Sequence, residues 1–311
     1  MSRHPAPHTV RTLASRLLPD EDLPDGGLPG GSGDVRPVDE GGEHSTWWVG
    51  TAHVLRLAPD AEVSARLRRE IALRAALRPR LTAPVPRSAA CATWADGLVC
   101  TLDVRLPGVS AEHREVSAEG EEDLAQLLAE LGGFTAAEAS ALGVPTAPAR
   151  HLAVLRRGAV RAARTLEEDG CFDGRLLGLL ETDPPAASTG PRPHGLAPAV
   201  LVHSDLKGEH LLVDGAGRVS GVLDWTDAVF GDPAEDIAGL ALSLGAPAAV
   251  RIGTAAGYAP ELSARGLQLA RCDTLVRLAD RLRGIDDSPL PLLRAQLARS
   301  WRATSMDRSA D

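Results

Sequence analysis

The sequence predicts an α+β protein of two lobes, a small N-terminal lobe with an antiparallel sheet and one helix and a larger, mostly helical C-terminal lobe. Short strand-like segments recur around one helix between residues 35 and 104. Helical periodicity dominates from residue 117 onward. A linker near residues 103–108, which ends in Pro107-Gly108, separates the two patterns.

This division predicts three parts of the chain. Residues 1–34 form an N-terminal helix and loop, since Val10, Leu13, Leu17 and Leu18 fall at helical spacing before a stretch rich in Asp, Gly and Pro. Residues 35–104 form the small lobe, and residues 105–311 form the helical lobe. In the small lobe we expect one helix over residues 62–77 and strands over 35–38, 47–49, 53–57, 91–93 and 98–104.

The C-terminal part is predicted to be helical except for one loop and the segment from 202 to 236. Residues 182–198 contain five prolines and are predicted to form a surface loop. Apolar residues at helical spacing predict a helix through Leu124 and Leu131 and another through Leu152 and Leu166. Four more predicted helices follow the loop, at 236–244, 247–258, 263–282 and 289–301.

Composition excludes several classes of protein. The chain is 44% hydrophobic and 24% charged, as is typical of a soluble globular protein. The net charge of −9 and the absence of a Lys/Arg stripe argue against a nucleic-acid partner. No apolar segment is long enough for a membrane span, and no secretory signal is visible. Four cysteines without a C-x-x-C pair complete the expectation of a cytoplasmic protein with reduced thiols.

Residues 202–236 carry the order of polar residues on which the functional prediction depends. His203-Ser-Asp205 follows an apolar strand, and His210 comes five residues after Asp205. Asp224 ends another apolar strand, nineteen residues after Asp205. The kinase catalytic loop H-R-D-x-x-x-x-N followed by D-F-G has a similar order of base, first metal ligand and second metal ligand. The segment therefore predicts a phosphoryl-transfer site in a protein-kinase-like fold.

Each of these residues has a predicted role. Asp205 would orient an attacking hydroxyl and accept its proton, and Asp224 would bind Mg²⁺. Lys207, the only lysine of the chain, would place an ammonium group on the transferring phosphate. His210 stands where kinases have Asn, and imidazole is a poor ligand for Mg²⁺. The sequence therefore leaves open whether His210 binds the metal or only orients Asp205 or a phosphate.

The small lobe supplies candidate nucleotide-binding residues. The turn at Gly41 and Gly42 would lay backbone N–H groups over phosphates, although a Gly-Gly turn is a weak signal. Arg56 on the third strand occupies the place where kinases carry a phosphate-binding lysine. Glu70 on the following helix is the natural partner for the Arg56 guanidinium.

Several polar residues of the segment have predicted structural roles. Asp232 is expected to cap the helix that follows, with Pro233 at its first position and Glu235 completing a capping box. Asp236 is expected to support the loop from His203 to Asp205, and His203 to act as a brace. The surplus of acidic residues here suits Mg²⁺ and a cationic substrate, with a solvated acidic face as the alternative.

Together these residues resemble the aminoglycoside phosphotransferase family of antibiotic and small-molecule kinases. The matching segments are 203–214, 221–225 and 231–238, with weaker matches at 54–56 and 69–73. The resemblance implies Asp205 as base, Asp224 as Mg²⁺ ligand and a nucleotide, ATP or GTP, between the lobes with its base near residues 101–105. His210 in place of Asn is similar to the macrolide phosphotransferases of this family.

We therefore expect a phosphotransferase that uses ATP or GTP and Mg²⁺ to phosphorylate a hydroxyl of a small molecule. The expected acceptor is an antibiotic of the aminoglycoside, macrolide or peptide class, and its phosphorylation would give resistance or self-protection. A protein kinase is one alternative, but the seven residues between Asp224 and Asp232 are too few for a peptide-binding activation segment. A nucleotide-binding regulatory protein with weak catalysis is the other, because of His210. The sequence leaves the acceptor, the phosphorylated position, the nucleotide and the oligomeric state open.

Overall fold

The computed structural model describes residues 5–18, 35–38, 45–181 and 197–308. They belong to two compact units, one of Met1–Arg80 with Pro84–Pro107 and one of Leu81–Ala83 with Gly108–Asp311. The first unit holds a sheet and two helices, and the second is mostly helical, so the predicted α+β class is confirmed. The predicted loop at 19–34, residues 182–196 of the predicted loop at 182–198 and the turn at Gly41 and Gly42 lie outside the described residues.

The N-terminal unit is built on a five-stranded antiparallel sheet in the order β1-β2-β3-β5-β4. Its strands are β1 (Val35–Pro37), β2 (Ser45–Val49), β3 (His53–Leu57), β4 (Ser88–Ala95) and β5 (Leu98–Val104). Asp96 and Gly97 join β4 to β5 with φ angles of 39° and 80°. Positive φ at both central residues is what a tight hairpin turn requires, and Asp-Gly is a preferred pair for it.

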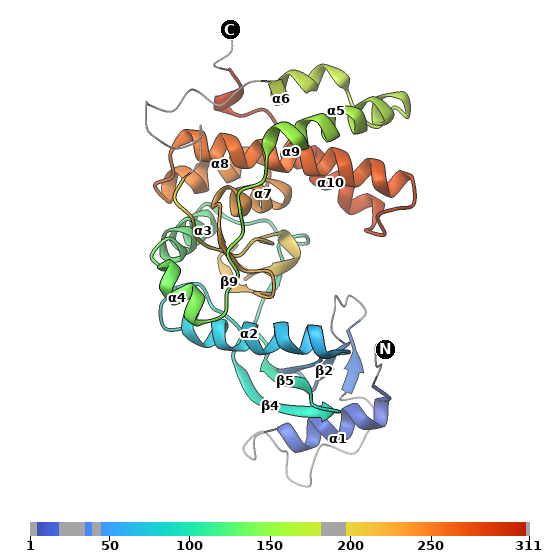
Figure 1. Ribbon diagram of the computed structural model, residues 1–311, viewed down its shortest axis with the longest axis vertical. Helices are drawn as coiled ribbons and strands as arrows, with labels where there is room; N and C mark the ends of the chain where they lie inside the picture. The colour runs from blue at the N-terminus through green and yellow to red at the C-terminus, as the bar shows by residue number, and fades with distance from the viewer. Residues whose placement is uncertain (1–4, 19–34, 39–44, 182–196, 309–311) are drawn as a thin grey trace. The chain divides into compact units, whose positions relative to one another are not determined.

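The helices α1 (Pro7–Leu17) and α2 (Ala61–Leu77) cover opposite faces of this sheet (Figure 1). Residues such as Val10 and Leu13 of α1 pack against buried leucines of β3 and β5. The α2 side chains pack instead against Ala58 and Val99, which face the other way. Both helices were predicted, because each carries an apolar stripe that only a sheet face can bury.

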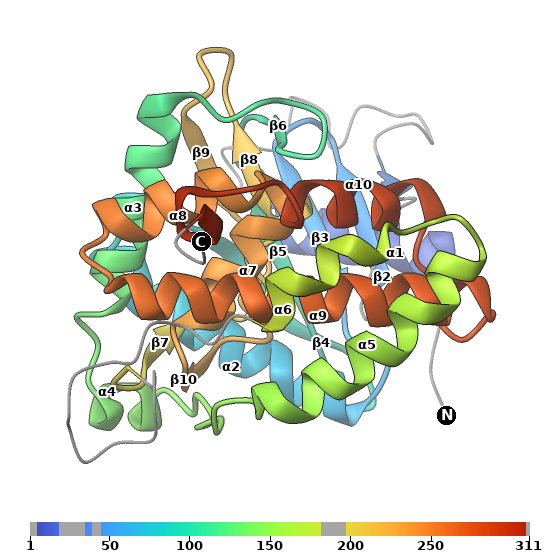
Figure 2. The same ribbon diagram turned by 90° about the horizontal axis from the view of Figure 1, so that it is seen from above.

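The C-terminal unit is mostly helical. Its helices are α3 (Ala118–Leu131), α4 (Ala136–Ala141), α5 (Leu152–Glu168), α6 (Gly178–Glu181), α7 (Ala234–Ser243), α8 (Ala246–Ala255), α9 (Pro260–Leu282) and α10 (Leu290–Ser300). The helices α3, α5, α7, α8, α9 and α10 confirm the predicted ones within a few residues at each end, whereas the short helices α4 and α6 were not predicted. Among the helices of this unit, α9 is the central element, in contact with α5, α7, α8 and α10 (Figure 2). No helix of the described residues has the length and apolar character needed to cross a membrane.

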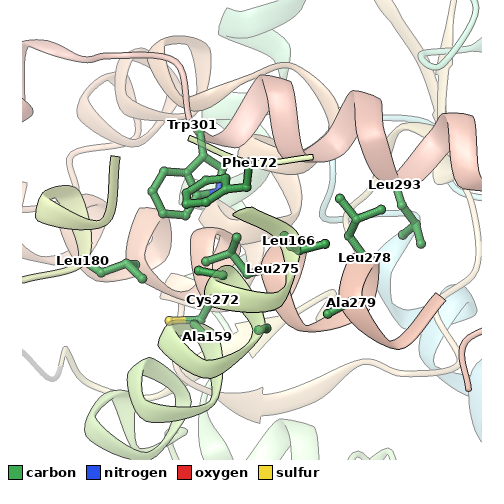
Figure 3. Packing of buried hydrophobic residues seen from close by; sticks show 12 residues of the cluster. Ala159, Leu166, Phe172, Leu180, Cys272, Leu275, Leu278, Ala279, Leu293 and Trp301 are labelled. Carbon is green, nitrogen blue, oxygen red and sulfur yellow. The ribbon is translucent and has the colours of Figure 1, made fainter. Parts of the chain in front are cut away.

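A hydrophobic core fixes the position of α9 relative to α5 and α10 (Figure 3). Leu166 of α5 and Leu275 of α9 are fully buried in it. Phe172 and Trp301 close one end, with ring centroids 4.8 Å apart and planes at 71°, an edge-to-face arrangement. This packing matters for the site because α9 also carries two charged residues of the cavity described below.

Short strands place the chemistry segment within this helical unit. One sheet has the order β6-β8-β9 (Val109–Ser110, Leu211–Val213 and Val219–Val222), and β7 (Val200–Val202) pairs with β10 (Val229–Gly231). Asp205 follows β7 and Asp224 follows β9, as the sequence predicts. The strand β10 was not predicted, because three residues are too few to show a period and its pairing with β7 is non-local.

Candidate active site

The loop that carries Asp205 has an unusual backbone conformation. Ser204 adopts a φ of 70° and Asp224, on the second loop, a φ of 54°. Non-glycine residues in this left-handed region cost on the order of 1–3 kcal/mol and persist only where the surroundings hold them. The two strained positions therefore coincide with the two loops that the sequence identified.

Asp236 of α7 holds the first of these loops in place. Its two carboxylate oxygens accept hydrogen bonds from the backbone N–H groups of His203 (3.0 Å) and Ser204 (2.8 Å). Burial raises the pKa of Asp236 to about 7, although both N–H donors favour its ionised form. The predicted support of the loop by Asp236 is confirmed.

His203 links the two loops and is fully buried. Its Nε2 donates to the carbonyl oxygen of Leu223, the residue directly before Asp224, at 2.8 Å. Its Nδ1 accepts from the backbone N–H of Asp205 at 3.3 Å. Because burial lowers the pKa of His203 to about 4, the ring is neutral at pH 7 and can donate and accept in this way. These contacts confirm His203 as a brace.

His210 lies between the predicted base Asp205 and the predicted metal ligand Asp224. Its Nδ1 donates to the backbone carbonyl of Asp205 at 2.8 Å and lies 3.4 Å from Asp205 Oδ2. Its Nε2 lies 3.8 Å from Asp224 Oδ2. A carbonyl oxygen only accepts, so Nδ1 carries a proton, and Nε2 is the ring nitrogen that faces Asp224.

Lys207 contacts Asp205 directly, since its Nζ forms an ion pair with Asp205 Oδ1. Both side chains are 22% exposed, so they are partly open to solvent. The structure thus brings together the four predicted residues of this unit: Asp205, Lys207, His210 and Asp224. Within the described residues, no group of three or more His, Cys, Asp or Glu side chains is arranged to hold a metal by itself.

A cavity of about 420 Å³ opens beside this cluster. Asp205 and Lys207 line one part of it, and its other charged lining residues are Arg150, Asp232, Glu235, Asp273 and Arg277. The remaining lining residues are mostly small or apolar, among them Ala147, Val229 and Leu242. A molecule in this cavity would reach the partly exposed carboxylate of Asp205.

The predicted capping box at the start of α7 is wrong. Ala234 N–H donates to Asp232 Oδ1 at 3.0 Å, but α7 begins at Ala234 and its N-cap is Pro233 rather than Asp232. A capping box would need the Glu235 carboxylate to accept from a backbone N–H at the start of the helix. Both oxygens of this carboxylate instead accept from Arg150, at 2.9 and 2.7 Å. Glu235 bonds Arg150 because a bidentate bond to a guanidinium is stronger than one bond to a neutral backbone N–H.

In the N-terminal unit, Arg56 and Glu70 form the predicted contact at 2.9 Å. Sequence reasoning missed the second half of this network, in which Arg74 bonds Asp103 at 3.1 and 3.2 Å and lies 3.6 Å from Glu70. Burial acts to raise the pKa of Asp103, but Arg74 and Arg56 hold it below its usual value. The position of Arg74, four residues after Glu70 on one helix, was a usable signal.

Comparison with known proteins shows the family of the chain and agrees with its fold. Residues 34–271 match the model of the phosphotransferase enzyme family (APH). The chain is 30% identical over 272 residues to viomycin phosphotransferase from Streptomyces vinaceus, a match that covers 85% of this chain and 88% of that protein.

Solved structures show the same fold at low sequence identity. The GDP complex of aminoglycoside 2'-phosphotransferase-IIIa superposes with a TM-score of 0.66 at 18% identity, covering 96% of this chain and 99% of that one. A macrolide 2'-phosphotransferase from Brachybacterium faecium gives a TM-score of 0.58 at 24% identity, covering 93% and 97%. The predicted kinase-like fold and enzyme class are confirmed. The chain is a small-molecule kinase and belongs to the phosphotransferase enzyme family.

Proposed function

We propose that this protein transfers the γ-phosphoryl group of ATP or GTP to a hydroxyl of an antibiotic. The observation that carries the proposal is the partly exposed Asp205 carboxylate in the wall of the cavity. The relative from Streptomyces vinaceus is named for the phosphorylation of viomycin, a peptide antibiotic. Fold relatives are named for aminoglycosides and macrolides, which defines the classes of acceptor to test.

Asp205 acts as the base in the proposed reaction. The acceptor hydroxyl donates to the Asp205 carboxylate, and its O–H bond breaks as its oxygen bonds the γ-phosphorus. The bond from that phosphorus to the β–γ bridging oxygen breaks, and the nucleoside diphosphate leaves. The proton passes to the Asp205 carboxylate. Such a positioned base contributes roughly 10²- to 10⁴-fold to the rate.

Three groups of the chain are proposed to handle phosphate charge. The Lys207 ammonium lies against Asp205 and can move to the transferring phosphoryl group. In the N-terminal unit, Arg56 would bind a nucleotide phosphate, held in orientation by Glu70. The backbone of Gly41 and Gly42 would contribute N–H donors to the same phosphates.

Asp224 would bind a divalent cation such as Mg²⁺, with His210 acting through a water, because imidazole itself is a poor ligand for this ion. The Asp224 carboxylate supplies the hard oxygen ligand that Mg²⁺ prefers, and His210 Nε2 lies 3.8 Å from the same carboxylate. Nucleotide phosphates and water would supply the remaining ligands, as is usual for Mg²⁺ in kinases. When bound, the cation neutralises charge that develops on the phosphates.

The product would be a phosphorylated antibiotic, and the biological result would be resistance or self-protection. Because the donor is ATP or GTP, the reaction belongs in the cytoplasm. A phosphotransfer screen of peptide, aminoglycoside and macrolide antibiotics with each nucleotide tests the proposal. We expect a mass gain of one phosphate on at least one acceptor.

The Asp205→Ala variant is the control in that screen, since it keeps the cavity and lacks the base. Binding of ATP or GTP without transfer to any acceptor would contradict the proposal. That result would favour the nucleotide-binding regulatory protein instead.

A further inference from the structure

The carboxylates that line the cavity are already occupied by cations of this chain. Asp205 contacts Lys207, and Asp232 accepts from Arg265 Nε at 2.6 Å. The other two, Glu235 of α7 and Asp273 of α9, share one guanidinium, that of Arg150. The sequence contains more acidic than basic residues in the segment from 202 to 236, but each carboxylate that lines the cavity has a cationic partner within the protein.

All three nitrogens of the Arg150 guanidinium donate hydrogen bonds to carboxylates. Its Nε and Nη2 donate to the two oxygens of Glu235, at 2.9 and 2.7 Å. Its Nη1 and Nη2 donate to Asp273, at 2.9 and 3.0 Å. The Arg150 side chain is still 35% exposed, so the triad of Arg150, Glu235 and Asp273 faces the space where an acceptor would lie.

The backbone of Arg150 is fixed as well. Arg265 of α9 donates from Nη2 to the Arg150 carbonyl at 2.7 Å while its Nε bonds Asp232. Arg265 is buried, so this link is shielded from water. An acceptor would have to break several charge-assisted bonds to move Arg150 away from the two carboxylates.

The charges around the cavity nearly cancel. Arg277, another lining residue, lies 3.3 Å from Asp286. The charged residues that line the cavity, together with their Asp and Arg ion-pair partners, comprise five carboxylates and four cations. The carboxylates are those of Asp205, Asp232, Glu235, Asp273 and Asp286, and the cations are Arg150, Lys207, Arg265 and Arg277. One negative charge is left, which can balance one positive charge of an acceptor but not several.

We infer that Arg150 sets the charge of the acceptor, so that the cavity takes a hydroxyl compound with at most one cationic group and disfavours polycations. The inference rests on the proposed function, whose acceptor it narrows. A polycation would bind best where several carboxylates lack a cationic partner. Two carboxylates of the cavity wall, Glu235 and Asp273, are instead paired with Arg150. The arginine thus acts against one class of acceptor while leaving the base Asp205 untouched.

Replacing the arginine gives a gain-of-function test. In Arg150→Met, Glu235 and Asp273 lose their partner and face the cavity. Titration calorimetry at low salt would compare kanamycin, a polycation, with a macrolide that carries one amino group, on the full chain. We expect wild type to bind kanamycin at least tenfold more weakly than the macrolide. The variant should bind kanamycin at least fivefold more tightly than wild type does, since two partly buried ion pairs are each worth roughly threefold.

Arg251→Ala is the matched control, because Arg251 forms a similar bidentate pair with Glu121 away from the cavity. It should leave both affinities unchanged. A gain for kanamycin of less than fivefold in Arg150→Met, or equal binding of both compounds by wild type, would overturn the inference.

Asp273→Asn keeps the shape of the triad and removes its net negative charge, so it serves if Arg150→Met does not fold. We expect its dissociation constant for the one-amine macrolide to rise at least threefold, and a smaller rise would count against the inference. Both readouts are equilibrium binding. Failure of the proposed function would instead appear as bound nucleotide and bound acceptor without phosphate transfer.

Discussion

Two networks of charged residues, one in each unit, use the same residue types for different purposes. In the N-terminal unit, Arg74, Glu70 and Asp103 are buried, and only Arg56 is slightly exposed. In the C-terminal unit, Asp205, Lys207 and the triad of Arg150, Glu235 and Asp273 are partly exposed and line a cavity. The buried network is shielded from solvent, whereas the open network lies where a bound molecule would meet it.

The difference shows that a count of charged residues says little until their partners are known. Breaking a buried ion pair leaves an uncompensated charge in a medium of low dielectric constant, and this is expensive. Removing one residue of a partly exposed pair costs less stability, because water solvates the charge that is left. We therefore expect mutations in the first network to reduce stability, and mutations in the second to change activity and specificity.

The largest effect should come from the base of the open network. Asp205→Ala should lower kcat by roughly 10³-fold or more while leaving the dissociation constant of the nucleotide nearly unchanged. Steady-state kinetics and nucleotide titration measure the two quantities separately. Equal losses in kcat and in nucleotide affinity would mean that Asp205 holds the nucleotide rather than the acceptor.

The buried network should respond in stability. Arg74→Met leaves Asp103 buried without its main partner, and we expect the free energy of unfolding of the N-terminal unit to fall by about 3–5 kcal/mol. Urea denaturation measures this loss. Arg251→Ala removes an exposed pair and should cost less than about 1 kcal/mol. Similar losses in both variants would erase the contrast between buried and exposed pairs.

The cation beside the base should have an intermediate effect. Lys207→Met removes the ammonium that would meet the transferring phosphoryl group, and we expect kcat to fall on the order of 10²-fold. Melting temperature should change little, because Lys207 is partly exposed. Should kcat remain within a few-fold of wild type, Lys207 would be only a partner of Asp205 without a role in transfer.

A smaller, pH-dependent effect is expected at Asp236, which supports the catalytic loop. Its pKa is raised to about 7 in the folded protein, so its stabilising contribution is fully present below the unfolded pKa near 4 and is lost as pH rises through 7. Relative to Asp236→Asn, wild type should lose about 2 kcal/mol of stability between pH 5 and pH 8. Urea denaturation at both values checks this, and parallel behaviour of the two proteins would refute it.

Local sequence patterns predicted the elements that carry the chemistry. The spacing of Asp205, His210 and Asp224 placed them on the ends of short strands, and their side chains meet as expected. The pair of Arg56 and Glu70 was also predicted, since a strand followed by a helix leaves few alternatives for it. Such features depend on backbone periodicity and on short segments, and both can be read from residue order.

The tertiary structure alone decided which charges are open to an acceptor. Arg150 meets Glu235 and Asp273 across 85 and 123 residues of chain, and nothing local marks it as their partner. Glu235 looked like a capping residue, and only the packing of α5, α7 and α9 brought a guanidinium to it. Periodicity specifies which face of a helix is buried, but the neighbours of that face follow from how the helices pack, so the charge balance of the cavity could not be predicted from the sequence.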